Sequence, residues 1–257
     1  MKYLKRAGFT VGLPALLVLA WWLLTLGSTS FFVPKPVDLV ETFGKVWFSS
    51  RFFTDVLPSI GRLLAGLVVT IVLGVVLGVL IGSVRWLRRF SEPMLEFLRA
   101  IPPVALIPLF MLMIGINDQM KVTIIVIGAI WPVLLNTVEG VRAVDDVLSS
   151  TCRIYRIKRF GRLRHLVLPG ASPQIMTGIR QSLSIGLILM VISEMFGSSS
   201  GLGFTIVVFQ RAFAIPEMWS GIAVLGLIGI GLSLVSRTIE RSVLGWYYGL
   251  KEVQRDS

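Results

Sequence analysis

The sequence has very few residues of the kinds that carry redox or metal chemistry. It contains one cysteine, Cys152, and one histidine, His165, among 257 residues. A single cysteine excludes an internal disulfide, and one cysteine with one histidine cannot supply the ligands of a zinc site. No G-x-x-x-x-G-K-[ST] segment occurs, so the phosphate-binding loop of P-loop ATPases is missing. We therefore expect no catalytic group, no metal and no bound cofactor in this chain.

Acidic residues are also scarce, with 14 against 25 basic ones and a formal net charge of +11. The basic residues stand in short clusters between apolar runs and do not cover one face of a polar domain, so nucleic-acid binding is not indicated. Hydrophobic residues make up 54% of the chain. This is more apolar surface than a water-soluble domain of this length can cover, and the lipid bilayer must be part of the solvent.

Six apolar runs approach or exceed the roughly 20 residues that a helix needs to cross a bilayer. The connections after the second and fourth runs are rich in arginine, whereas basic residues in the other connections are few and mostly offset by acidic ones. By the positive-inside rule, both termini are expected in the cytoplasm. The sequence predicts an all-α bundle of about six transmembrane helices. The runs are 9–26, 60–84, 94–114, 120–141, 174–196 and 219–235.

The second run has a small residue at every fourth position. Such a stripe lets another helix approach closely, because lipid provides no hydrophobic drive for helix association. We expect the stripe to pack within the bundle in preference to forming a dimer seam. Its members are Gly66, Thr70, Gly74, Gly78 and Gly82.

Prolines interrupt the third run. Pro102 and Pro103, with Pro108 beyond them, must bend or break the third helix near mid-membrane. The broken helix either lines a substrate path or is only kinked.

An amphipathic segment lies between the first two runs. After Pro34-Lys35-Pro36, with Asp38 as a helix cap, apolar residues recur with helical spacing. This amphipathic helix between the first two runs is either a connector that packs on the bundle or a docking surface for a partner. The recurring residues are Val37, Val40, Phe43 and Trp47.

Four charged residues of the apolar runs stand out, because an ionisable group within the membrane is costly unless it is paired or hydrated. Arg99 and Glu139 stand near the inner ends of their runs, where snorkelling or a structural ion pair explains them, and Arg180 is close enough to the inner surface to reach water. Glu194 stands near the outer end of its run, with Ser193 before it and a glycine-rich turn after it. We hypothesise that Glu194 and Ser193 face the translocation path or an outer gate. A structural polar network is the alternative.

The longest polar connection, residues 142–173, alternates arginines with apolar residues after a helix start at Asp145 and Asp146. Such a cationic amphipathic segment lies on a bilayer surface or enters a protein groove. Its end, Leu168-Pro169-Gly170, followed by Gly178, resembles the cytoplasmic-loop signature of the binding-protein-dependent permeases of ABC importers. In that family a Glu-Ala-Ala tripeptide and a glycine precede Leu-Pro. Here those positions hold Ser150, Thr151 and Cys152, and Arg156.

The resemblance implies that this loop forms coupling helices that insert into a groove of a separate ATPase subunit. Gly161 could provide the turn that the family's glycine provides. The residues implied in ATPase coupling are Ser150, Arg153, Tyr155, Arg156, Ile157, Phe160 and Gly161.

Further stretches, in order along nearly the whole chain, are similar to the branch of that family that transports sulfonates, taurine, nitrate and certain heterocyclic precursors. They include Phe32-Val33-Pro34-Lys35-Pro36, Ser59-Ile60-Gly61-Arg62, Arg99-Ala100-Ile101-Pro102-Pro103, and Glu194 with Gly201-Leu202-Gly203.

The resemblance implies a type I ABC importer fold, with residues 1–257 as one permease domain and residues 142–173 as its coupling loop. It implies a homodimer in the bacterial cytoplasmic membrane, an ATPase that carries ATP and Mg, and an extracytoplasmic substrate-binding protein. The main alternative is a secondary transporter driven by an ion gradient, which predicts internal repeats and acidic residues near the midplane. We find no clear repeat. An intramembrane enzyme and a structural scaffold are further alternatives.

Overall fold

The computed structural model describes residues 2–27, 31–196, 198–247 and 249, with side chains from residue 12 onward. Every regular element in these ranges is helical. The elements are α1 (Lys2–Leu26), α2 (Pro36–Trp47), a π-helical turn η1 (Phe52–Val56), α3 (Leu57–Ser83), α4 (Arg85–Ala100), a 3-10 turn η2 (Pro103–Leu106), α5 (Ile107–Ile114), α6 (Asp118–Arg142), α7 (Asp146–Ile154), α8 (Arg159–Arg162), a π-helical turn η3 (Leu163–Val167), α9 (Leu168–Phe196), α10 (Leu202–Arg211) and α11 (Ile215–Val243).

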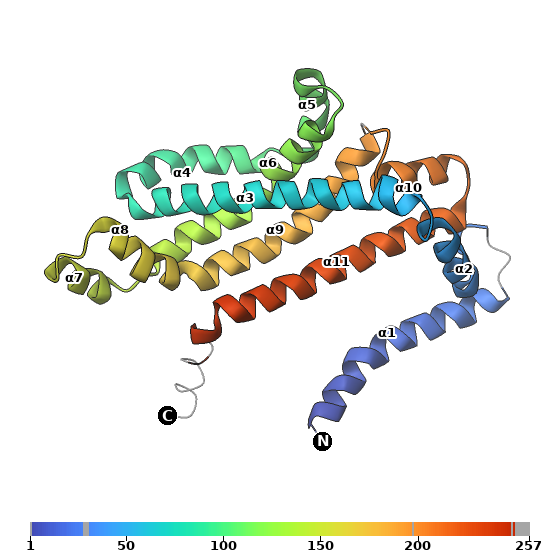
Figure 1. Ribbon diagram of the computed structural model, residues 1–257, viewed down its shortest axis with the longest axis horizontal. Helices are drawn as coiled ribbons and strands as arrows, with labels where there is room; N and C mark the ends of the chain where they lie inside the picture. Colours follow the sequence, from blue (N-terminus) through green and yellow to red (C-terminus); the bar gives the residue numbers. More distant parts are fainter. Residues whose placement is uncertain (1, 28–30, 197, 248, 250–257) are drawn as a thin grey trace.

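Long helices lie side by side and give the molecule two distinct ends (Figure 1). The central helix α6 packs against both α3 and α9, and α11 runs beside α9 and α10. We call the end that carries α7 and α8 the basic end, and the opposite end, at α2 and α10, the α10 end. In Figure 1, α11 runs from the α10 end towards the basic end, and α1 begins below the middle of the molecule and runs towards α2.

Four helices in the described residues are long and apolar enough to cross a membrane, and the bent pair of α4 with η2–α5 raises the number to five. The described apolar part of α1, Gly12–Leu26, is shorter. The predicted all-α membrane bundle of about six spans is confirmed. The helices of the last two predicted runs extend beyond them, because hydropathy detects only the part of a helix that lipid or the core surrounds.

The third predicted run, 94–114, is not one continuous helix. It contains the end of α4, a break at Ile101–Pro102, and then η2 and α5, and the two arms meet at 79°. Pro102 lacks an N–H, and a residue before proline avoids the helical region, as the ψ of 119° at Ile101 shows. The helix before the break begins at Arg85, within the predicted inner connection. Hydropathy missed its first part because the charged residues on one face lower the average of the apolar residues on the other.

The small-residue stripe of α3 lies against α6. A Cβ at Gly66 would stand 2.6 Å from Ile125 Cγ2, and one at Gly78 would stand 2.6 Å from Thr137 Cβ. The stripe therefore brings two backbones together inside the chain. Buried residues of α3, α5, α6 and α9 continue this contact as the main core: Leu63, Leu67, Ile107, Met120, Ile124, Ile125, Leu189 and Met190.

The helix α2 packs on the bundle through its C-terminal part. Trp47 is 2% exposed, and its indole N–H donates to Ser220 Oγ of α11 at 2.9 Å. Val37 and Val40 face away from the bundle, contrary to the predicted apolar face. The expected cap at Asp38 is also wrong. Pro36 occupies the first turn, so Asp38 lies inside the helix and makes no capping bond.

Candidate functional site

A buried carboxylate, Glu194 of α9, is the centre of a polar network at the α10 end. The Glu194 side chain is fully buried. Its oxygens accept hydrogen bonds from Ser59 Oγ at 2.8 and 2.9 Å and from Arg62 Nη1 at 2.6 Å. The backbone N–H of Gly203 donates to it at 3.0 Å. A cation and two neutral donors therefore satisfy the hydrogen-bonding capacity of this buried carboxylate.

Arg62 of α3 links this carboxylate to α6 and to the turn before α10. Its Nε donates to Asp118 Oδ1 at 2.7 Å, and its Nη1 and Nη2 reach the carbonyl and the hydroxyl of Ser200 at 3.4 and 3.3 Å. Lys121 of α6 donates to Ser198 Oγ at 2.8 Å and lies 3.4 Å from Asp118. We call Ser59, Arg62, Asp118, Lys121 and Glu194 the polar clasp, because together they join α3, α6, α9 and the turn before α10.

The turn before α10 fits closely over the clasp. Gly201 has φ +117°, a conformation that side chains disfavour, and a Cβ there would stand 2.5 Å from the Glu194 carboxylate. Both the backbone conformation and the lack of space therefore require glycine. The Leu202 N–H donates to Ser59 Oγ at 2.9 Å, so Ser59 and Glu194 accept the first free N–H groups of α10. An anion at a helix N-terminus is favourable, and Glu194 therefore also caps α10.

These contacts bear on the residues predicted for the path or gate. Glu194 lies in the network that we named as the alternative, and Ser193 is buried with its hydroxyl on the Met190 carbonyl. Pro102 and Pro103 belong to the break between α4 and α5, where Pro103 packs near Gly128 of α6. Whether any of the four controls passage stays a prediction.

Arg62, the ion-pair partner of Glu194, was not predicted from the sequence. Ser59 and Arg62 were recognised only as part of a motif, and Asp118 and Lys121 only counted among the charges of a connection. The signal was available in principle. Arg62 stands at the start of an apolar helix and Glu194 near the end of another, and two such buried charges of opposite sign need each other.

The other charged residues of the runs also form ion pairs. Arg99 lies 2.7 Å from Glu96 on its own helix, and Glu139 lies 2.6 Å from Arg142 on α6. Arg180 of α9 pairs with Glu240 of α11. These pairs agree with the interpretation we favoured for Arg99 and Glu139.

The basic end carries the predicted coupling loop as two short helices. Asp145 caps α7, accepting hydrogen bonds from the N–H groups of Val147 and Leu148 at 2.6 and 3.3 Å, which confirms the predicted helix start. Arg162 Nη2 donates to Ser149 Oγ at 3.3 Å and ties α8 to α7. Most of the predicted coupling residues are exposed and Gly161 is partly buried: Ser150, Arg153, Tyr155, Arg156, Ile157 and Phe160 project outward.

Arg156 ends α7 with a left-handed backbone, φ +52°. The Ile157 N–H donates to the Cys152 carbonyl at 2.9 Å and the Arg156 N–H to Arg153 at 3.1 Å, which is the Schellman arrangement. This position usually holds glycine, and it is where the family pattern has its glycine. The turn therefore forms at Arg156 itself and does not need Gly161.

The overall arrangement matches membrane subunits of ABC transporters of known structure. Superposed on a structure of the MetNI methionine ABC transporter in an inward-facing conformation, the chain gives a TM-score of 0.63 at 19% identity. The match covers 74% of this chain and 94% of that one. The fold is therefore that of an ABC importer's transmembrane subunit.

Sequence comparisons place the chain more closely. Residues 70–243 match the family described as the binding-protein-dependent transport system inner membrane component. The chain is 34% identical to an aliphatic sulfonates transport permease protein, SsuC, of Bacillus subtilis (strain 168), over 94% of this chain and 89% of that protein. It is 27% identical to the taurine transport system permease protein TauC of Escherichia coli (strain K12), over 95% and 91%. The chain belongs to this family of transport permeases, and the predicted resemblance is confirmed.

Proposed function

We propose that the chain is the membrane-spanning permease subunit of an ATP-driven importer, with its basic end in the bacterial cytoplasm. The arginines at the start of α4 and along α7, α8 and η3 gather at this end, and positive charge favours the cytoplasmic side. Both termini are then cytoplasmic, and the α10 end faces an extracytoplasmic substrate-binding protein. A second copy completes the translocation path as a homodimer.

The observation that carries this proposal is the uncovered apolar surface of the α7–α8 loop. Tyr155 and Phe160 are 76% and 73% exposed, between arginines, on the part of the chain farthest from the bundle. Large apolar side chains that their own fold leaves bare are typical of a protein-binding surface. In a chain of this family, the matching partner is an ATPase subunit with a groove for the loop. ATP and Mg bind that partner.

The names of the relatives support a small organic solute with a sulfonate group. Aliphatic sulfonates and taurine appear in the names of two permeases that align with nearly the whole chain. We therefore propose a sulfonate-type substrate for this importer. The chain itself contributes the path and the coupling surface, and ATP hydrolysis belongs to the partner.

Co-purification with an ABC ATPase subunit from the same organism tests the coupling surface. Phe160→Asp should abolish the complex or its transport-linked ATP hydrolysis, because a charge replaces an apolar side chain in the proposed groove. Phe48→Asp is the matched control. Phe48 is also exposed, at 87%, but it follows α2 at the opposite end, and the complex should survive its change.

Two results would contradict the proposal. Loss of the complex in both variants would show a general effect on folding, with no specific role for the loop. A wild-type chain that binds no ATPase, yet moves solute down an ion gradient, would favour the secondary-transporter alternative.

A further inference from the structure

A charged crevice opens between α4 and α6 near the basic end. Its volume is about 260 Å³, below the roughly 300–1,000 Å³ of sites for drug-sized ligands. Apolar residues of α3, α4 and α6 form its floor, and six charged residues form its walls. The charged residues are Arg88, Glu92, Glu96 and Arg99 of α4 and Glu139 and Arg142 of α6.

The crevice lies beside membrane-spanning helices and not in a peripheral loop. In Figure 1, α4 runs back along α3 from the basic end. Leu87 and Leu95 of α4 pack on the cluster of Ile81, Leu134 and Val138, which belongs to α3 and α6. At 1.5 Å per residue, the 16 residues of α4 extend about 24 Å along the bundle, so Arg99 is carried deep beside the spans.

The two faces of α4 show which one meets water. Aromatic and apolar residues at positions i, i+4, i+8 and i+11 cover its outer face, and Trp86 stacks on Phe90 with ring centroids 5.8 Å apart. The charged face has the same spacing and borders the crevice, and its side chains are about half exposed, with Glu96 at 55% and Arg99 at 48%. Charges are costly in lipid, so this face must meet a hydrated space. The outer-face residues are Trp86, Phe90, Met94 and Phe97.

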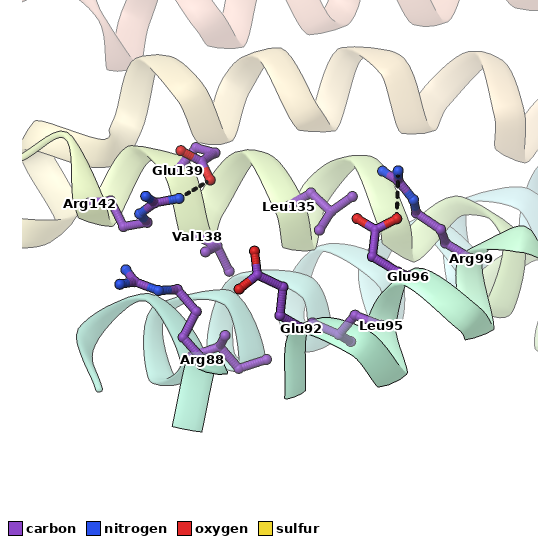
Figure 2. Close-up of a pocket in the computed structure, with 10 residues that line it drawn as sticks. Arg88, Glu92, Leu95, Glu96, Arg99, Leu135, Val138, Glu139 and Arg142 are labelled. Atoms are coloured by element: carbon purple, nitrogen blue, oxygen red, sulfur yellow. Dashed lines mark hydrogen bonds and ion pairs between the residues drawn. The ribbon is translucent and has the colours of Figure 1, made fainter. Parts of the chain in front are cut away.

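Two of the six charged side chains remain available for a solute. Figure 2 shows Arg99 bonded to Glu96 and Arg142 bonded to Glu139, at 2.7 and 2.6 Å. In the same view Arg88 and Glu92 point from α4 towards α6. Within the part of the chain that the structure describes, neither of these two has an ion-pair partner. They lie four residues apart on one face, one positive and one negative.

We propose that this crevice is a solute-binding site on the substrate path, specific for a small zwitterion that carries both an anionic group and an ammonium group. Arg88 binds the anionic group and Glu92 binds the ammonium group. The walls carry three positive and three negative charges. A simple anion would gain from Arg88 but would meet the uncompensated carboxylate of Glu92, so the site disfavours it. The inference rests on the proposed function for the direction of transport.

The test compares two sulfonates that differ in one charge. Taurine carries a sulfonate and an ammonium group, and ethanesulfonate carries only the sulfonate. Binding of each is measured by calorimetry on the full-length permease in lipid nanodiscs. Wild type should bind taurine at least about tenfold more tightly, because one charge-assisted hydrogen bond is worth roughly that factor.

Three variants assign the roles. Glu92→Gln should remove the preference for taurine while leaving ethanesulfonate binding the same or tighter. Arg88→Gln should weaken binding of both compounds about tenfold. Arg89→Gln is the matched control, since Arg89 is next in the chain, equally charged and outside the crevice, and binding should not change. Complex formation with the ATPase, measured on the same variants, reports whether each is folded.

The outcomes separate this inference from the proposed function. A wild type that binds both compounds equally, or neither, overturns the zwitterion site even if the ATPase complex forms normally. Equal losses in Arg88→Gln and Arg89→Gln overturn it as well. A clear preference for taurine without any ATPase complex would support the site and overturn the ATP-driven importer.

Discussion

At the residue scale, Asp145 and Asp38 stand near the starts of two helices, but only Asp145 caps its helix. Asp145 as the cap of α7 followed from local sequence, because its carboxylate accepts hydrogen bonds from N–H groups only two and three residues along the chain, those of Val147 and Leu148. The same reasoning failed for Asp38, where Pro36 moves the helix start. The pairing of Arg62 with Glu194 joins positions 132 residues apart, so no local rule could reveal it.

Arg156 is the residue whose own conformation can be tested directly. Arg156 is a non-glycine residue in the left-handed region, which costs roughly 1–2 kcal/mol. Glycine avoids this cost, but part of the gain is offset because glycine loses more conformational entropy on folding. Arg156→Gly should therefore stabilise the α7 turn by about 1 kcal/mol or less. We expect the Ile157 N–H, which bonds Cys152, to exchange with deuterium up to about fivefold more slowly.

A matched change in the same helix gives the control. Arg153 lies in the last turn of α7, where glycine weakens a helix, so Arg153→Gly should speed exchange of the same amide. Faster exchange in Arg156→Gly would show that the arginine side chain, and not the backbone turn, stabilises this loop.

At the element scale, the polar clasp adds to the hydrophobic contacts that hold the helices of the core together. It fastens α3, α6, α9 and α10 at one end of the bundle, while the glycine stripe of α3 fastens α3 to α6 along its length. The stripe was predictable because its spacing is local. The clasp was not predicted, because its members come from different helices and each looks like an ordinary charge when it is considered alone.

The clasp predicts a non-additive response to mutation. Glu194→Gln or Arg62→Gln alone should lower the free energy of unfolding by roughly 3–5 kcal/mol, because each leaves a buried charge without its partner. The double variant should lose less than the sum of the two, because neither charge then remains. Detergent-titrated unfolding in bicelles measures all three.

The exposed Lys45–Glu41 pair of α2 is the control for this cycle. Its hydrogen bond lowers the pKa of Glu41, yet both side chains are in solvent, so Lys45→Gln should leave stability almost unchanged. If the losses of unfolding free energy at Arg62 and Glu194 were strictly additive, the two residues would not be coupled. Each would then stabilise the fold independently of the other.

At the scale of the whole molecule, the two ends differ in the polar groups that they carry. The α10 end is held together by the polar clasp, whereas the basic end gathers arginines around exposed apolar side chains on α7 and α8. The fold class, the family and the position of the loop could be read from hydropathy, charge and motif order. The crevice beside α4 could not, because hydropathy averages the aromatic and charged faces of that helix and hides both.

Solute uptake into proteoliposomes that contain the permease, an ATPase subunit and a binding protein tests most directly whether the chain is an ATP-driven importer subunit. Uptake of a sulfonate-type solute should require ATP and all three components, and Phe160→Asp should abolish it. Uptake by the permease alone, driven by a proton or sodium gradient without ATP, would contradict this prediction.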